Sequence, residues 1–229
     1  MSSVEIGTVI VTGAASGLGR AVATAIEADG GTAIGFDLQP VDGIESVRVD
    51  LADTEATEAA TRQVIGEHGR LDGVVTAAGT DACGPLDGVP AERWNRVVAV
   101  NLLGTAAVVR AALPALVESH GRVVTVASTL GIRGLPDATA YCASKFGVVG
   151  FTQALAAETA GKVGVTLLAP GGMDTAFFDG RDERYKPPPD AKLSPPEEVA
   201  EAVVFALSRP PGVELRHALF CPSTETSWP

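Results

Sequence analysis

Cysteine is scarce in this sequence of 229 residues. Cys83, Cys142 and Cys221 make an odd number and lack the close spacing of zinc ligands, which argues against a disulfide framework and against a metal site. The start of the sequence shows no apolar, signal-like segment. We therefore expect reduced thiols and a cytoplasmic protein.

Positive charge is also in short supply. Lys and Arg number 17 against 28 Asp and Glu, for a formal net charge of -11. Such a chain is expected to bind neither nucleic acid nor an anionic membrane surface. No stretch approaches 18 uncharged apolar residues, so no membrane span is expected. The chain does have 46% hydrophobic residues, a content and length that predict a single domain over 1–229.

Short β-branched runs alternate with helical patterns. Strands are expected at residues 4–12, 32–37, 46–49, 71–77, 122–127, 163–169 and 217–222, and helices at 18–28, 54–68, 91–118 and 141–159. This order predicts an α/β Rossmann fold: a doubly wound, mostly parallel seven-stranded sheet with helices on both faces. Such sheets bind ligands at the carboxyl ends of their strands.

A glycine-rich turn joins the first strand to the first helix. Gly13 would permit the turn, Gly17 a close approach of a pyrophosphate, and Gly19 the packing of helix on strand. Together with Ser16 and Leu18 they place backbone amides and a helix N-terminus around an anion. The spacing is Gly-x-x-x-Gly-x-Gly and not the longer Gly-x-Gly-x-x-Gly. Many glycine-rich turns bind no ligand, but the position of this one between a strand and a helix favours a dinucleotide-binding loop.

The second strand ends in Asp37, 18 residues beyond Gly19. A carboxylate at about this spacing accepts hydrogen bonds from the adenosine ribose and repels a 2′-phosphate. Neither Phe36 nor Leu38 supplies a positive charge beside it. The pattern favours NAD(H) over NADP(H); the alternative is that Asp37 only starts the turn that follows.

Tyr141 and Lys145 lie four residues apart in a predicted helix, so both side chains share one face. A free tyrosine, with a pKa of about 10, is a poor base near neutral pH, and a neighbouring ammonium lowers that value. The pair therefore predicts a proton-transfer site. A tyrosine and a lysine at this spacing also occur by chance on solvated helix faces.

Other candidates stand at strand ends or in an unusual helical position. Ser128 follows the fifth strand, Ala78 and Gly79 follow the fourth, and the pair Pro170 and Gly171 follows the sixth. Asn101 lies in mid-helix among apolar residues, which is unfavourable unless its amide finds partners. We expect it to bind backbone at a helix distortion near Gly104 or to hold a water.

The sequence from residue 4 to 175 resembles the short-chain dehydrogenase/reductase family. The segment 12–19 resembles its cofactor loop, and Ser128 precedes Tyr141 by the family's usual thirteen residues. The resemblance implies a catalytic set of Asn101, Ser128, Tyr141 and Lys145, adenine contacts from Asp50 and Leu51, and nicotinamide contacts from 170–175. The implied cofactor-binding residues are Gly13, Ser16, Gly17, Leu18, Gly19, Asp37, Leu38, Asp50, Leu51, Ala78, Gly79, Tyr141, Lys145, Pro170, Gly171, Met173 and Thr175.

The family's mechanism then implies a role for each catalytic residue. Tyr141 exchanges a proton with an alcohol or ketone while hydride passes to or from NAD. Lys145 binds the nicotinamide ribose and, with the positive ring of the oxidised cofactor, holds the Tyr141 pKa down. Ser128 binds the substrate oxygen, and Asn101 positions a water that links Lys145 to solvent. The expected reaction interconverts a secondary alcohol and a ketone, with no metal.

Substrate identity is left open by the sequence. Residues 176–195, with Phe177, Phe178 and Tyr185, are expected to form a lid over the substrate; the alternative is a surface loop. Arg181 and its basic neighbours either meet an acidic substrate or are solvated. Alternative functions are a non-catalytic NAD(H)-binding regulator and an NADPH-dependent ketoreductase; an extended epimerase would need a second domain. Small residues on the Asn101 and Tyr141 helices predict a homodimer or homotetramer.

Overall fold

The computed structural model describes residues 4–225, so the first three and last four residues of the predicted 1–229 domain lie outside the described part. Seven strands form one sheet in the order β3-β2-β1-β4-β5-β6-β7. They are β1 (Thr8–Thr12), β2 (Thr32–Asp37), β3 (Glu45–Arg48), β4 (Gly73–Thr76), β5 (Arg122–Val126), β6 (Gly164–Pro170) and β7 (His217–Phe220). Every neighbouring pair is parallel, so the predicted doubly wound sheet is confirmed.

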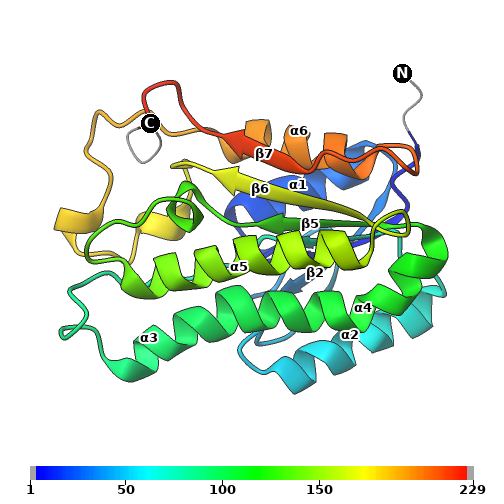
Figure 1. Cartoon of the computed structure of the whole chain (residues 1–229), viewed down its shortest axis with the longest axis horizontal. Helices are drawn as coiled ribbons and strands as arrows, with labels where there is room; N and C mark the ends of the chain where they lie inside the picture. Colours follow the sequence, from blue (N-terminus) through cyan, green and yellow to red (C-terminus); the bar gives the residue numbers. More distant parts are fainter. Residues whose placement is uncertain (1–3, 226–229) are drawn as a thin grey trace.

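Helices cover both faces of the sheet (Figure 1). Helices α1 (Gly17–Ala28) and α6 (Pro196–Leu207) pack together on one face. The other face carries α2 (Thr54–His68), α4 (Thr105–Ser119) and α5 (Thr139–Glu158), and α3 (Ala91–Val98) runs into α4 through a π-helix at Ala99–Gly104. The two largest apolar clusters lie one on each side of the sheet, and the central strands are buried on both faces as parallel strands require.

Helix α6 was not predicted from the sequence. Its first residue is Pro196, and Pro195 stands at its N-cap. Two consecutive prolines do not look like the start of a helix in the sequence, yet the first turn of a helix tolerates proline because its N–H would be unpaired there. The strand expected from residue 4 begins instead at Thr8, since Gly7 has a φ of 69° and breaks the extended backbone.

The continuous helical stretch Ala91–Ser119 is 29 residues long and, by length and composition alone, could cross a membrane. In this fold 44% of its most apolar window is buried inside the chain. Its buried side chains include Val108, Ala112 and Leu116, which belong to the apolar cluster on the face of the sheet covered by α2, α4 and α5. Because core helices of folded domains have the same composition, we attribute its apolar character to packing.

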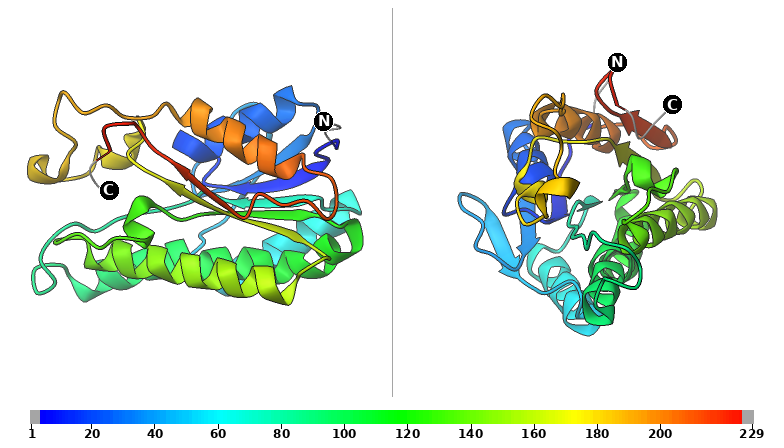
Figure 2. Two further views of the ribbon diagram at one scale, coloured as in Figure 1. Left: turned by 45° about the horizontal axis from the view of Figure 1, so that its top comes forward. Right: turned by 90° about the vertical axis from the view of Figure 1, so that its left-hand side faces the viewer.

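The carboxyl ends of the strands meet at one end of the molecule. The chain order reverses between β1 and β4, and this is the point at which open α/β sheets form a ligand crevice. Beyond the same end lies the segment that follows β6, which extends from the sheet and returns to α6 (Figure 2).

Candidate active site

One cavity of about 1060 Å³ opens at this crevice. It is lined by every residue predicted for the cofactor and for catalysis except Asn101. Its walls come from the turn after β1, the ends of β2, β4, β5 and β6, helix α5 and the segment after β6. Residues spread from Gly13 to Thr175 in the sequence therefore meet around a single space.

The glycine turn has the form that a bound pyrophosphate requires. Gly13 has a φ of 73°, and a Cβ there would lie 2.8 Å from the Cα of Ala78. A Cβ on Gly19 would lie 2.1 Å from the Gly13 carbonyl oxygen. No side chain caps the N-terminus of α1 at Ser16, so the first backbone N–H groups of this helix can face a ligand in the cavity. These residues fit a dinucleotide.

Asp37 stands at the end of β2 and lines the cavity. Its Oδ2 accepts from the Ala15 N–H at 3.0 Å and its Oδ1 from the Gln39 N–H at 2.9 Å. The bond from Gln39 belongs to the local turn that the sequence analysis gave as the alternative role of Asp37. The bond from Ala15 connects Asp37 to the glycine-rich turn. The carboxylate is thus held next to the glycine-rich turn, which is where a group that binds the adenosine ribose is expected.

Asp50 carries a partner that the sequence did not reveal. The Arg96 guanidinium donates two hydrogen bonds to its carboxylate, each of 3.0 Å. This hydrogen bonding is the main cause that lowers the pKa of the Asp50 carboxyl. Arg96 also lines the cavity, where the resemblance places the adenine. The two residues are 46 positions apart, so no local pattern could have paired them.

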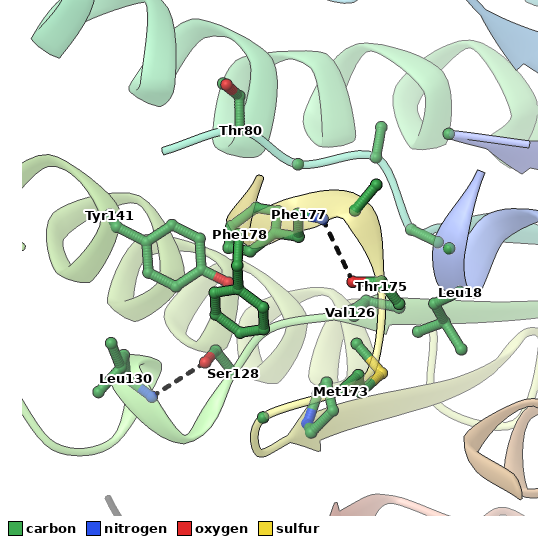
Figure 3. A pocket seen from close by; sticks show the side chains of 18 of the residues that line it. Leu18, Thr80, Val126, Ser128, Leu130, Tyr141, Met173, Thr175, Phe177 and Phe178 are labelled. Atoms are coloured by element: carbon green, nitrogen blue, oxygen red, sulfur yellow. Dashed lines mark hydrogen bonds between the residues drawn. The ribbon is translucent and has the colours of Figure 1, made fainter. Parts of the chain in front are cut away.

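Tyr141, Ser128 and Lys145 converge at the other end of the cavity (Figure 3 shows the first two). The Lys145 ammonium lies 5.6 Å from the centre of the Tyr141 ring and donates to the Val126 carbonyl at 2.8 Å. Ser128 Oγ accepts from the Leu130 N–H at 3.1 Å, which orients the hydroxyl. Parallel strand β5 and helix α5 thereby supply a hydroxyl, a phenol and an ammonium to one space.

The pKa of Tyr141 moves opposite to the sequence-based expectation in the chain alone. Burial raises it to about 12, and hydrogen bonding with Ser128 only partly offsets that effect. Burial also lowers the pKa of Lys145 to about 8. Both shifts have one main cause, because loss of contact with water disfavours the charged form of either group; Lys145 is 3% exposed, and Tyr141 is half-buried. A lowered Tyr141 pKa therefore remains a prediction for the cofactor complex.

Asn101 lies behind the cavity in the π-helix, where the sequence predicted a distortion. Its Oδ1 accepts from the Thr80 N–H at 2.8 Å, and its Nδ2 donates to the Thr80 carbonyl and to Ser144 Oγ, both at 3.0 Å. The amide thus holds the loop after β4 against α5. A Cβ on Gly79 would lie within 3.8 Å of both Asn101 Oδ1 and Lys145 Nζ. The role of Asn101 in holding a water stays a prediction.

The segment predicted to form a lid packs against Tyr141 through Phe177. Its base is closed by two hydrogen bonds of 3.0 Å, from Asp174 N–H to the Ser194 carbonyl and from Ser194 N–H to the Gly172 carbonyl. The Phe177 ring lies 5.7 Å from the Tyr141 ring, and Phe178 packs edge-on against Phe177 at 5.6 Å (Figure 3). The lid's two phenylalanines therefore form the roof of the space in which a substrate would lie.

Two features of the substrate end were missed by the sequence analysis. Asp81, in the loop after β4, binds Arg181 of the lid, 100 positions away. Glu225 lines the cavity, and its Oε2 accepts from the Gly172 N–H at 2.9 Å. Neither contact follows from spacing, because each joins segments that only the folded sheet brings together. In the described part of the chain no three potential metal ligands cluster.

Comparisons with known proteins identify relatives of this chain. The 2-dehydro-3-deoxy-L-rhamnonate dehydrogenase (NAD(+)) of Sphingomonas sp. (strain SKA58) is 37% identical over 182 residues, which cover 74% of this chain and 73% of the relative. D-threitol dehydrogenase of Mycolicibacterium smegmatis is 34% identical over 221 residues, which cover 87% of this chain and 85% of the relative. The ligand-free aldohexose dehydrogenase of Thermoplasma acidophilum superposes with a TM-score of 0.85 at 24% identity, over 94% of this chain and 92% of its own, and shows the shared fold.

A sequence model described as short chain dehydrogenase matches residues 7–186. That range includes the glycine turn, Asp37, all four predicted catalytic residues and the first part of the lid. The chain belongs to the short-chain dehydrogenase/reductase family of nicotinamide-dependent oxidoreductases.

Proposed function

We propose that this protein is an NAD-dependent dehydrogenase that interconverts a secondary alcohol and a ketone. The observation that carries the proposal is the convergence of Ser128, Tyr141 and Lys145 on the cavity that also holds the glycine turn and Asp37. When bound, the oxidised nicotinamide ring supplies a hydride acceptor. Everything else in the reaction is positioning and proton transfer by the chain.

Ser128 binds the substrate oxygen, because its hydroxyl is fixed by Leu130 and faces the Tyr141 phenol. Tyr141 takes the alcohol proton during oxidation or gives its own to a ketone during reduction. Oxidation requires an anionic phenol, so the raised Tyr141 pKa must fall in the complex; the Lys145 ammonium and the positive charge of oxidised cofactor act in that direction. Phe177 and Phe178 exclude water from this exchange.

The preference for NAD rests on Asp37. Its carboxylate is anchored to the glycine turn, where the 2′-phosphate of NADP would meet a fixed negative charge. A solved relative, an alcohol dehydrogenase from Thermococcus sibiricus with a TM-score of 0.83 and 25% identity over 93% of this chain and 95% of its own, is complexed with 5-hydroxy-NADP. The family thus accommodates both cofactors, and the acidic residue is the feature by which we assign NAD here.

We also propose a homodimer or homotetramer that uses α4 and α5. Leu103, at the start of this surface, is 49% exposed and Phe146 of α5 is 46% exposed. A Cβ on Gly150 would meet nothing within 4 Å, so this position is open to a partner, whereas Gly147 already packs on Leu102 inside the chain. Light scattering at micromolar concentration tests the assembly, and a monomer would contradict it.

Titration with NADH and with NADPH, followed by turnover of secondary alcohols with NAD, tests the function. We expect NADH to bind at least about tenfold more tightly, a difference of about 1.4 kcal/mol. Tyr141→Phe should abolish turnover and keep cofactor affinity. Tighter NADPH binding would instead indicate an NADPH-dependent ketoreductase, and absence of turnover in the wild type with NADH bound would indicate a non-catalytic NAD(H)-binding protein.

A further inference from the structure

A buried ion pair lies near Tyr141, and its arginine, Arg181, lines the cavity. Arg181 of the lid donates from Nη2 to Asp81 Oδ2 at 2.7 Å, and only 18% and 7% of the two side chains are exposed. Besides the burial that raises the pKa of Tyr141, the Asp81 charge raises it and the Arg181 charge lowers it. The pair therefore lies close enough to the reacting phenol for both of its charges to act there.

The Arg181 guanidinium is held in a fixed orientation. It lies 4.9 Å from the centre of the Phe177 ring and 4.6 Å from that of Phe178, and Nη1 donates to the Tyr185 carbonyl at 3.3 Å. The Tyr185 hydroxyl in turn donates to Asp137 Oδ2 at 2.9 Å. A guanidinium that is stacked and hydrogen-bonded in this way loses little freedom when it binds a ligand.

Asp81 is engaged by its own loop as well as by the lid. Oδ1 accepts from the Ala82 N–H at 2.6 Å, and Oδ2 accepts from the Cys83 thiol at 3.2 Å. Arg181 differs, because a guanidinium has five N–H donors. Its hydrogen bonds within residues 4–225 use one N–H of Nη1 and one N–H of Nη2, which leaves the second N–H of each nitrogen for a ligand, whereas Nε is buried and not exposed to the cavity. Arg181, which lines the cavity, can therefore donate further hydrogen bonds from Nη1 and Nη2 to a ligand next to Phe177 and Phe178.

Charge balance decides which ligand suits these donors. The positive charge of Arg181 is already matched by Asp81, so the pair as a whole is neutral. A substrate carboxylate would bring a second negative charge close to Asp81 in a dry site, where like charges repel strongly. A neutral hydroxyl oxygen accepts from the guanidinium without disturbing the pair.

We propose that the Asp81–Arg181 pair determines specificity by binding a second, neutral hydroxyl group of the substrate, so that the substrate class is diols, polyols and the matching hydroxyketones. This assignment rests on the proposed alcohol dehydrogenase function. A buried ion pair is weak evidence for stability, since desolvation offsets most of its attraction. A role in recognition accounts for the presence of the Arg181 side chain in the cavity lining, next to Phe177 and Phe178.

A four-carbon series tests the proposal, with NAD as cofactor: butan-2-ol, butane-2,3-diol, erythritol and the anion 3-hydroxybutanoate. We expect kcat/KM for butane-2,3-diol to exceed that for butan-2-ol by about tenfold or more, because a polar site discriminates against substrates that leave it unpaired. The hydroxy acid should be a poorer substrate than the diol. A diol-to-alcohol ratio near one, or a preference for 3-hydroxybutanoate, would overturn the proposal.

Variants assign the preference to the pair. Arg181→Met should lower the diol-to-alcohol ratio about tenfold. Asp81→Asn leaves the Arg181 charge unmatched and should raise kcat/KM for 3-hydroxybutanoate relative to the diol. Arg184→Met removes the same charge from an exposed position of the lid and should leave the ratio unchanged. If Arg181→Met does not fold, the neutral double variant Asp81→Asn/Arg181→Gln gives the same test, and an unchanged ratio in it means that the pair only closes the lid.

Binding separates this proposal from the proposed function. Saturation-transfer NMR with erythritol and the NADH complex should give a signal in the wild type that Arg181→Met loses. Oxidation of butan-2-ol without erythritol binding and without a diol preference would refute the role of the pair and leave the dehydrogenase function standing. Erythritol binding without turnover of any alcohol would support the pair and refute the function.

Discussion

Replacing Lys145 by methionine is expected to stabilise the protein without its cofactor while it removes activity. Burial lowers the pKa of Lys145 to about 8 from an ordinary value of 10.5. A difference of about 2.5 between the two pKa values corresponds to roughly 3 kcal/mol by which the charged form opposes folding at pH 7. Lys145→Met loses the bond to the Val126 carbonyl, which costs about 1 kcal/mol, so we expect a net gain near 2 kcal/mol.

The sign of the pH dependence identifies the cause. Between pH 8 and 10.5 the unfolded chain keeps a proton on Lys145 that the folded chain has lost, so the stability of the wild type rises with pH in that window. The advantage of Lys145→Met should therefore shrink as the pH rises from 7 to 10. Urea unfolding of both proteins at several pH values measures the difference in their free energies of unfolding. The contributions of the other titrating groups cancel in this difference because both proteins contain them.

The control is Lys162→Met, at an exposed position, which should show no such trend. An advantage of Lys145→Met that stays constant with pH, or a variant less stable than the wild type at pH 7, would refute the reasoning. Either result would mean that the Lys145 ammonium is better solvated than its burial indicates.

Three further predictions concern the cofactor and the scaffold. Asp37→Ala should reduce the proposed preference for NADH over NADPH by about tenfold in fluorescence titrations, because it removes the fixed negative charge that we expect beside the cofactor ribose. Gly13→Ala should weaken binding of both cofactors and lower the Tm, since its Cβ would meet the Ala78 backbone at 2.8 Å and its φ is 73°; Gly134→Ala, where a Cβ would meet nothing, is the control. Asn101→Ala should lower the free energy of unfolding by about 1–3 kcal/mol in urea titrations, because it leaves the peptide group of Thr80 unpaired; a change below about 0.5 kcal/mol would contradict that role.

Most of the sheet was predictable because parallel strands leave a strong signal. Runs such as Arg122–Val126 are buried along their whole length and stand between turn residues. Helix α6 was missed because it begins at two consecutive prolines, Pro195 and Pro196, which in most sequences mark irregular segments, although proline also begins helices. The prediction of distortion near Gly104 succeeded since a buried asparagine among apolar residues needs partners, and the π-helix brings Asn101 to Thr80.

The cavity's remaining residues could not be found in this way. Arg96 with Asp50 and Arg181 with Asp81 are pairs whose members stand far apart in the sequence. Each member alone has the appearance of an ordinary surface charge, and only the packing of α3 and of the lid decides its partner. Likewise the raised Tyr141 pKa follows from burial under Phe177, a tertiary property that the four-residue spacing to Lys145 does not contain.

The closed base of the lid lets this segment change without disturbing the sheet. Both ends of the segment leave the domain at one point, where Met173 and Ser194 pair as an isolated bridge. A loop whose ends already meet can change in length at small entropic cost and without shifting the register of any strand. We therefore expect residues 176–193 to tolerate changes in length and sequence, so that substrate preference can diverge through this segment while the proposed proton-transfer centre on α5 and after β5 is kept.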